Sequence, residues 1–117
     1  MNYLKISTIT ATTLTCLTLF SCSKKIAGTS GLSQCINSKL VELRKGGCPS
    51  RDSLKQYTFQ NKTVYVYQTG SCGADFASPV IDENCKELGF LGGFAGNQTI
   101  NGEDFSKAIY VKTVWNN

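Results

Sequence analysis

The residues of this chain with the clearest chemistry are its cysteines. Six of the 117 residues are cysteine, and none is histidine. Four lie in the body of the chain, at Cys35, Cys48, Cys72 and Cys85, with 12, 23 and 12 residues between them. Zinc-binding pairs usually stand two to four residues apart, whereas an even number of cysteines in a small exported domain is typical of disulfides. The sequence therefore predicts two disulfides and no metal site, with free thiols as the alternative.

The acidic residues give little sign of catalysis. Adjacent carboxylates occur at Asp82-Glu83 and at Glu103-Asp104, and Asp75 lies between Cys72 and Cys85. General acid–base catalysis needs two carboxyl groups that converge in a cleft and have separated pKa values. Adjacent acids in loops are more typical of solvated turns, and a histidine base is excluded. We therefore expect no enzymatic activity and no cofactor.

Three weaker motifs were considered. Calcium could use the side-chain oxygens of four residues, although EF-hand spacing is absent: Asn97, Asn101, Glu103 and Asp104. Gly92-Gly93 lacks the lysine and hydroxyl of a phosphate-binding loop, so close approach of backbones in a sheet explains it better. Asp52-Ser53-Leu54 resembles short O-glycosylation sites of exported bacterial proteins, and a turn residue at Asp52 is the alternative.

The N-terminal residues have the pattern of an export signal. Lys5 is followed by an uncharged stretch from Ile6 to Phe20, which is typical of a signal peptide and shorter than the ~20 apolar residues of a spanning helix. Leu19-Phe20-Ser21-Cys22 resembles the lipobox of bacterial lipoproteins. This resemblance implies diacylglycerol on the Cys22 sulfur, cleavage before Cys22 and acylation of the new amino terminus. The alternative is an ordinary cleaved signal with an incidental cysteine.

These features divide the chain into three parts. We expect a lipoprotein signal peptide at residues 1–21, a lipidated flexible tether at 22–32 and a disulfide-stapled domain at 33–117. Several acyl chains would hold Cys22 on a membrane, and we expect the periplasmic face of an outer membrane. The net charge of +4 falls to +3 once Lys5 is removed with the signal, and the charges are scattered. A nucleic-acid partner, which needs a clustered basic surface, is not expected.

The sequence of the domain predicts one helix followed by several strands. Ser33 is a suitable N-cap, and Ile36, Leu40 and Leu43 repeat at helical spacing before Gly46-Gly47 ends the helix. Strands are expected at 55–60, 63–68, 80–81, 90–96 and 108–115, the first two joined by a turn at Asn61-Lys62. The sequence predicts an α+β fold, with one N-terminal helix packed on a small, mainly antiparallel sheet.

The predicted elements constrain the disulfide pairing. A helix over residues 33–45 is ~18 Å long, whereas a disulfide joins Cα atoms ~4.4–6.8 Å apart. Cys35 and Cys48, at opposite ends of that helix, should therefore not pair. The strand at 63–68 returns the chain toward the helix end near Cys48. We predict the pairs Cys48–Cys72 and Cys35–Cys85.

A broader resemblance covers residues 35–115. Its features stand in order along the chain: Cys48-Pro49, Val64-Tyr65-Val66-Tyr67, Cys72, Asp82-x-x-Cys85, Gly92-Gly93 and a closing strand with Trp115. The pattern resembles a family of small bacterial lipoproteins that carry a cysteine-containing domain of unknown function. Members have an adjacent cysteine pair where this chain has Ser71-Cys72. The resemblance implies no activity.

Two functions from different classes follow. The first is a lipid-anchored cell-envelope protein that binds an envelope protein or glycan, or has a structural role, with Tyr65, Tyr67 and Tyr110 as a recognition face. The second is a protease inhibitor that uses the Cys72–Cys85 loop, because that stretch faintly resembles the centre of a Kazal-type inhibitor. Inhibition of a protease, or a single cut in that loop, would favour the second function.

Overall fold

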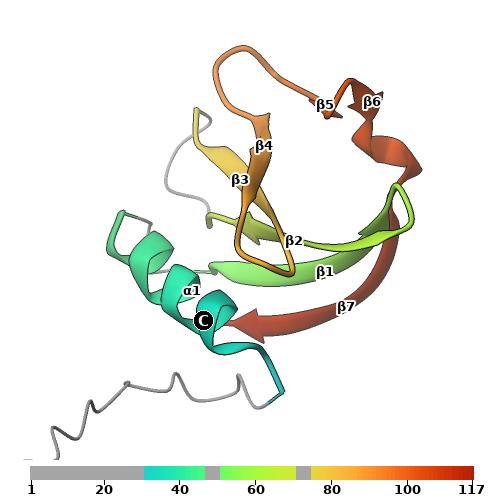
Figure 1. The fold of residues 1–117 in the computed structure, drawn as a ribbon. Helices are drawn as coiled ribbons and strands as arrows, with labels where there is room; N and C mark the ends of the chain where they lie inside the picture. Colours follow the sequence, from blue (N-terminus) through green and yellow to red (C-terminus); the bar gives the residue numbers. More distant parts are fainter. Residues whose placement is uncertain (1–30, 47–50, 71–74) are drawn as a thin grey trace, which may run out of the picture.

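In the computed structural model, which describes residues 31–46, 51–70 and 75–117, one helix packs on a five-stranded antiparallel sheet (Figure 1). The elements in chain order are α1 (Gln34–Gly46), β1 (Ser53–Phe59), β2 (Lys62–Gln68), β3 (Ala77–Asp82), β4 (Glu87–Gly92), β5 (Thr99–Ile100), β6 (Glu103–Asp104), the 3₁₀ helix η1 (Phe105–Lys107) and β7 (Ile109–Asn116). The predicted α+β fold, with an N-terminal helix on a mainly antiparallel sheet, is confirmed.

Helix α1 begins where the sequence predicts. The Ile36 amide donates a hydrogen bond to Ser33 Oγ at 3.3 Å, as expected of an N-cap serine. Ile36 and Leu40 are 1% and 0% exposed, so the predicted apolar stripe faces the sheet. Arg44, in the last turn, lies 4.9 Å from the Trp115 ring centroid and connects the end of α1 to β7.

The sheet has the order β4-β3-β2-β1-β7, so β7 returns from the end of the chain to pair with β1. Strands β1 and β2 form a hairpin whose turn residues are Gln60 and Asn61, with φ angles of 50° and 58°. Two consecutive positive φ values are characteristic of a type I′ turn, which matches the twist of the strands. The expected turn at Asn61-Lys62 was therefore wrong by one residue.

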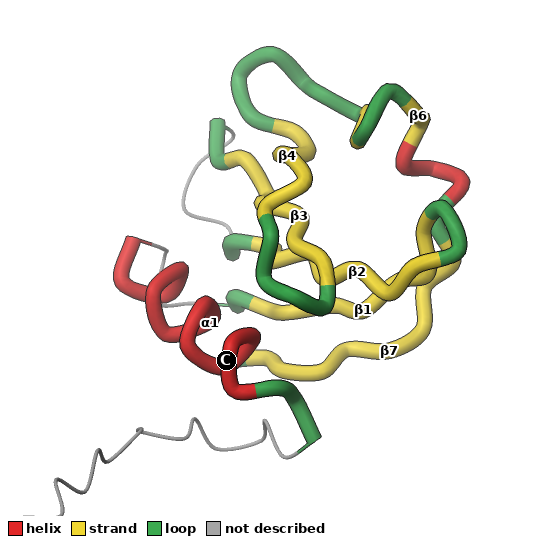
Figure 2. The backbone as a smooth tube through the Cα atoms, viewed as in Figure 1, coloured by secondary structure: helices red, strands yellow, loops and turns green. Residues whose placement is uncertain are grey.

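The sheet buries apolar side chains on both faces. On the α1 side, the buried cluster consists of Ile36, Leu40, Leu54, Tyr67, Ile81 and Trp115. On the opposite side, it consists of Phe59, Val64, Val66, Val80 and Ile100. Figure 2 shows β4, β6 and the connections between them on the far side of β1 and β2 from α1. The strands of the central hairpin are therefore covered by α1 on one face and by the chain around β5 to η1 on the other.

No helix within the described ranges is both long enough and apolar enough to span a membrane.

The burial of Leu40 gives a first prediction. Replacing Leu40 with alanine removes a fully buried side chain between α1 and the sheet, and should lower the free energy of unfolding by about 2–5 kcal/mol. Ser38, on the exposed side of α1, is the matched control, because Ser38→Ala should change stability by less than about 0.5 kcal/mol. Urea denaturation of the two variants tests this, and equal midpoints would contradict the packing described for α1.

Candidate functional site

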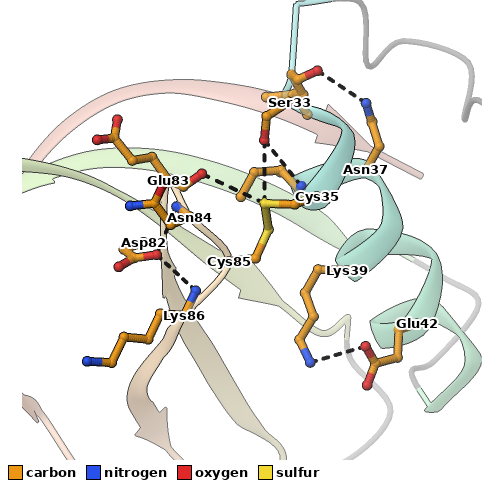
Figure 3. Close-up of a disulfide and its surroundings, with 12 residues drawn as sticks. Ser33, Cys35, Asn37, Lys39, Glu42, Asp82, Glu83, Asn84, Cys85 and Lys86 are labelled. Carbon is orange, nitrogen blue, oxygen red and sulfur yellow. Dashed lines mark hydrogen bonds and ion pairs between the residues drawn. A yellow bond between two sulfur atoms is a disulfide. The ribbon is translucent and has the colours of Figure 1, made fainter.

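A disulfide joins the start of α1 to the turn between β3 and β4 (Figure 3). It connects Cys35 and Cys85, whose Cα atoms are 6.0 Å apart and which are separated by 50 positions in the sequence. This is one of the two pairs expected from the sequence. Ser33, which caps α1, places its hydroxyl oxygen 3.7 Å from the Cys35 sulfur. The bond fixes the amino-terminal end of α1 over one end of the sheet.

Hydrogen bonds within the β3–β4 turn fix the position of Cys85. Asp82 Oδ1 accepts hydrogen bonds from the backbone amides of Asn84 and Lys86, both at 2.9 Å. Cys85 itself has a φ angle of 64°, an uncommon conformation for a residue with a side chain. Asp82 is therefore a turn-forming residue in this structure (Figure 3), which accounts for one of the acidic residues considered as candidate catalytic groups.

The remaining cysteines fall outside the described residues. Cys16 and Cys22 lie before residue 31, and Cys48 and Cys72 lie in the gaps at 47–50 and 71–74. One disulfide is thus seen in the described part of the chain where the sequence predicts two. The Cys48–Cys72 bond and the lipidation of Cys22 stay predictions, as do the signal peptide and tether at residues 1–32.

A buried carboxylate lies at the other end of the helix-covered face. Asp52, 2% exposed, accepts a hydrogen bond from the Tyr67 hydroxyl at 2.7 Å and another from the Gly70 amide at 2.8 Å. Burial raises the pKa of Tyr67 well above its ordinary value, and the hydrogen bond to Asp52 raises it further. The Asp52–Tyr67 hydrogen bond connects the residue before β1 to the end of β2, and its role is structural.

The same geometry bears on the possible glycosylation site at residues 52–54. Asp52 and Leu54 are 2% and 1% exposed. Ser53 is the first residue of β1 and stands between Gln68 of β2 and Asn116 of β7 in the sheet. Asp52 is a buried residue with hydrogen-bond partners from β2 and the residues after it, and not the turn residue that the alternative interpretation expected.

The three tyrosines expected to form a recognition face do not lie on one exposed surface. Tyr65 and Tyr67 share a face of β2, as alternation predicts, but α1 covers that face and Tyr67 is 2% exposed. Tyr65 is half-buried, and its burial, with a contribution from Glu83, raises its pKa. Tyr110 is 53% exposed and packs on Tyr57, with ring centroids 5.6 Å apart. The recognition face was wrong because the sequence could not show which side α1 covers.

The four residues considered as calcium ligands all take part in side-chain hydrogen bonds. Glu103 accepts from Gln60 at 3.0 Å and pairs with Lys107 at 3.4 Å, and these two partners lower its pKa. Asp104 accepts from the Ser106 amide at 2.8 Å and caps η1. Asn97 Oδ1 accepts from the Thr99 amide at 3.3 Å and from the Thr99 hydroxyl at 3.2 Å, and Asn101 Nδ2 donates to Gln60 Oε1 at 3.4 Å. Within the described ranges, no group of three or more acidic or cysteine side chains is placed to hold a metal ion.

Gly92 and Gly93 belong to a turn. Gly92 exchanges two backbone hydrogen bonds with Asn97, at 2.7 and 3.0 Å, and Gly93 has a φ angle of 73°. A Cβ atom built on Gly93 would lie 3.3 Å from the Cβ of Ala77. The positive φ angles of Gly92 and Gly93 and the close approach of Gly93 to Ala77 explain this glycine pair, in agreement with the interpretation made from the sequence. Strand β4 ends at Gly92 instead of continuing to residue 96.

Two exposed apolar regions were not identified from the sequence as surfaces. On β7, Ile109, Tyr110 and Val111 are 68%, 53% and 47% exposed. Phe76, Phe90 and Phe94, around the far end of β3 and β4, are 46%, 46% and 94% exposed. The strand at β7 was predicted correctly, but the sequence did not reveal that β7 would be an edge strand with side chains open to solvent on both faces. Phe94, which was expected in a strand at 90–96, lies in the turn after β4. These regions are the candidate binding surfaces of the described domain.

The comparisons place the chain in a family. Residues 44–117 match the family described as a domain of unknown function, DUF6970, and the chain belongs to this family. A search of curated proteins found no match, and neither did a search of solved structures. The matched region contains every strand of the sheet and Cys85, whereas Cys35 and most of α1 precede it.

Loss of the disulfide should destabilise the domain. A cross-link closing a 50-residue loop contributes about 4 kcal/mol in the chain-entropy treatment, within a usual range of about 2–5 kcal/mol. The double variant Cys35→Ser/Cys85→Ser should therefore unfold at a clearly lower urea concentration than the oxidised protein. Full reduction should destabilise the unmodified protein by at least as much. Equal stability of the double variant would contradict a structural role for this bond.

The Asp52–Tyr67 pair gives a prediction with a pH dependence. Tyr67→Phe leaves the buried carboxylate without its hydroxyl donor and should cost about 1–3 kcal/mol. In the folded protein Tyr67 stays protonated above pH ~10, whereas in the unfolded chain it ionises there. Stability should thus fall as pH rises above ~10, because the unfolded state then binds fewer protons.

Chemical denaturation between pH 8 and pH 11 measures both effects. Tyr67→Phe should make the alkaline decline in unfolding free energy shallower. Tyr57→Phe is the matched control, because Tyr57 is also partly buried with a raised pKa but lies on the other face of the sheet, and its replacement should flatten the decline less. An alkaline decline that is unchanged in Tyr67→Phe would show that this tyrosine ionises normally in the folded state.

Proposed function

We propose that this chain is a lipid-anchored protein of the cell envelope whose domain acts as a non-enzymatic binding or structural module. The observation that carries the proposal is the position of Cys22, at the end of Leu19-Phe20-Ser21-Cys22 and directly after an uncharged stretch that follows a basic start. Several acyl chains on this residue would hold the chain on a membrane far more firmly than one chain does.

The disulfide supports export. Structural disulfides form and persist in oxidising compartments and are rare in the cytosol. Cys35 and Cys85 are bonded in the structure, and a bond of this kind agrees with a periplasmic domain attached by Cys22. We place the protein on the periplasmic face of an outer membrane, with an envelope protein or a glycan as its partner.

A second disulfide, Cys48–Cys72, is part of this proposal. The hydrogen bond from the Gly70 amide to Asp52 Oδ1 at 2.8 Å brings together the chain just after residue 50 and just before residue 71. Cys48 is four residues before Asp52, and Cys72 is two residues after Gly70. Short connections from two hydrogen-bonded residues limit how far apart these cysteines can be, which favours their pairing.

The protease-inhibitor alternative receives less support. A substrate-like inhibitor loop has to be an exposed segment that a protease can accept. The stretch from Cys72 to Cys85 contains β3, which pairs with β2 on one side and β4 on the other. Val80 and Ile81 in that strand are 0% and 1% exposed. A binding module that uses an exposed part of the sheet fits these contacts better.

Intact-mass spectrometry of the native protein from membranes tests the proposal. We expect a mass that begins at Cys22 and includes acyl chains, with four hydrogens gained on reduction. Cys22→Ala should abolish acylation and prevent the cleavage that precedes Cys22, so that no mass beginning at residue 22 with acyl chains is found. The Cys22→Ala variant keeps the four domain cysteines, so its mass should still increase by four hydrogens on reduction. A native mass without lipid would overturn the anchor, and a gain of two hydrogens would overturn the second disulfide alone.

A further inference from the structure

The outer edge of β7 is an exposed strip that is apolar and basic. Within the described residues β7 pairs with β1 alone, so it forms one edge of the sheet. Ile109, Tyr110 and Val111 are between 47% and 68% exposed, and Lys112 beside them is exposed. An edge strand of this kind usually marks an interaction surface or has to be protected from pairing with other strands.

Pairing with another strand is hindered by the shape of β7. The register with β1 shifts between Leu54 and Lys55 and again between Gln56 and Tyr57. These shifts leave Val114 and Val111 as extra residues without a partner in the register. Bulges bend and twist an edge strand and interrupt its ladder, so a flat strand from a second copy or a peptide would fit poorly along this edge.

The charges of this edge suit an anionic surface. The sequence of β7 contains Lys112 and no acidic residue, and Lys55 of β1 stands opposite Thr113. Glu103, a nearby acid before β7, is engaged by Lys107 and Gln60. Tyrosine, lysine and aliphatic side chains together are typical of protein surfaces that rest in the headgroup region of anionic membranes.

The start of the described chain lies beside this edge. Gly31 and Leu32 line a depression of about 190 Å³ together with the β7 residues Lys112, Thr113 and Val114. Figure 1 shows the start of the described chain on the α1 and β7 side, with the connection after β4 at the opposite end of the domain. Cys22 is nine residues before Gly31, and nine residues span at most ~32 Å. A lipid on Cys22 would therefore hold Gly31, and the β7 residues that line the same depression, within ~32 Å of the bilayer.

We propose that the β7 edge strip, formed by Ile109, Tyr110, Val111 and Lys112, rests on the anionic lipid surface that holds the Cys22 anchor. The inference depends on the proposed lipid anchor and adds an orientation to it. The strip contributes apolar contacts at the headgroup boundary, and Lys112 contacts lipid phosphates. The opposite end of the domain, with Phe76, Phe90 and Phe94, then faces away from the membrane and is available to a partner.

Tryptophan quenching in vesicles tests this orientation with the full mature chain. Trp115 is the only tryptophan and is 6% exposed, so it gives a constant background. Ile109→Trp places a reporter on the strip, and Phe94→Trp, at a residue that is 94% exposed, is the matched control at the other end. The acylated variants are reconstituted in phosphatidylethanolamine–phosphatidylglycerol vesicles with brominated acyl chains, and Tyr110→Trp serves as a second reporter if Ile109→Trp fails to fold.

We expect quenching at Ile109→Trp to exceed that at Phe94→Trp at least twofold, and we expect Lys112→Glu to reduce it. Equal quenching, or stronger quenching at Phe94→Trp, would overturn the orientation. Cross-linking of β7 to a second copy without quenching would overturn it in favour of a dimer interface. The mass of each sample separates the two proposals, because an acylated chain without quenching overturns this inference alone and an unacylated chain overturns both.

Discussion

The Cys35–Cys85 disulfide fixes the start of α1 to the β3–β4 turn, and the helix-covered core depends on that attachment. A helix of 13 residues is marginal in water by itself and is stabilised mainly by packing of its apolar face. That face is narrow here, because Ile36 and Leu40 are its fully buried residues. In the unfolded chain, the cross-link keeps the start of α1 close to the β3–β4 segment, although the two cysteines are separated by 50 positions in the sequence.

The other end of α1 is held by different chemistry. Arg44 lies over the Trp115 ring at 4.9 Å, and the Asp52–Tyr67 hydrogen bond of 2.7 Å lies in the same face of the sheet. A buried carboxylate is costly unless it is hydrogen-bonded, and Asp52 has two donors. The helix is therefore fixed by a covalent bond at its start and by a cation–π contact at its end.

The sequence predicted α1, β1, β2 and β7 well because their signals are local, whereas β3 and β4 begin three residues earlier than expected and β5 and β6 were not among the expected strands. Ser33 as N-cap, the spacing of Ile36 and Leu40, and the alternation through Val64 and Tyr65 all depend on neighbours within a few residues. The pairing of Cys35 with Cys85 was expected from the helix length, which excludes Cys35–Cys48, and from the return of the 63–68 strand toward Cys48. What could not be predicted was which face α1 would cover, because alternation divides Tyr65 and Tyr67 from Val64 and Val66 without saying which set meets the helix.

The buried role of Asp52 was missed for a related reason. A single aspartate before a strand is usually a turn residue, and its partners Tyr67 and Gly70 are 15 and 18 positions away. Only the hairpin register brings them together. The exposure of Ile109 and Val111 was also hidden, since a strand pattern shows alternation but not whether the strand lies at the centre or the edge of a sheet.

The family match includes the whole sheet but leaves out most of α1, the helix that covers one face of it. Residues 44–117 include every strand but only the last turn of α1. Without α1, one face would expose Leu54, Tyr67, Ile81 and Trp115, which are now at most 6% exposed. Exposed apolar surface of that kind is unfavourable in water. The folded unit therefore has to extend at least to Ser33, and the cysteine partner of Cys85 comes from the segment that precedes the matched family domain.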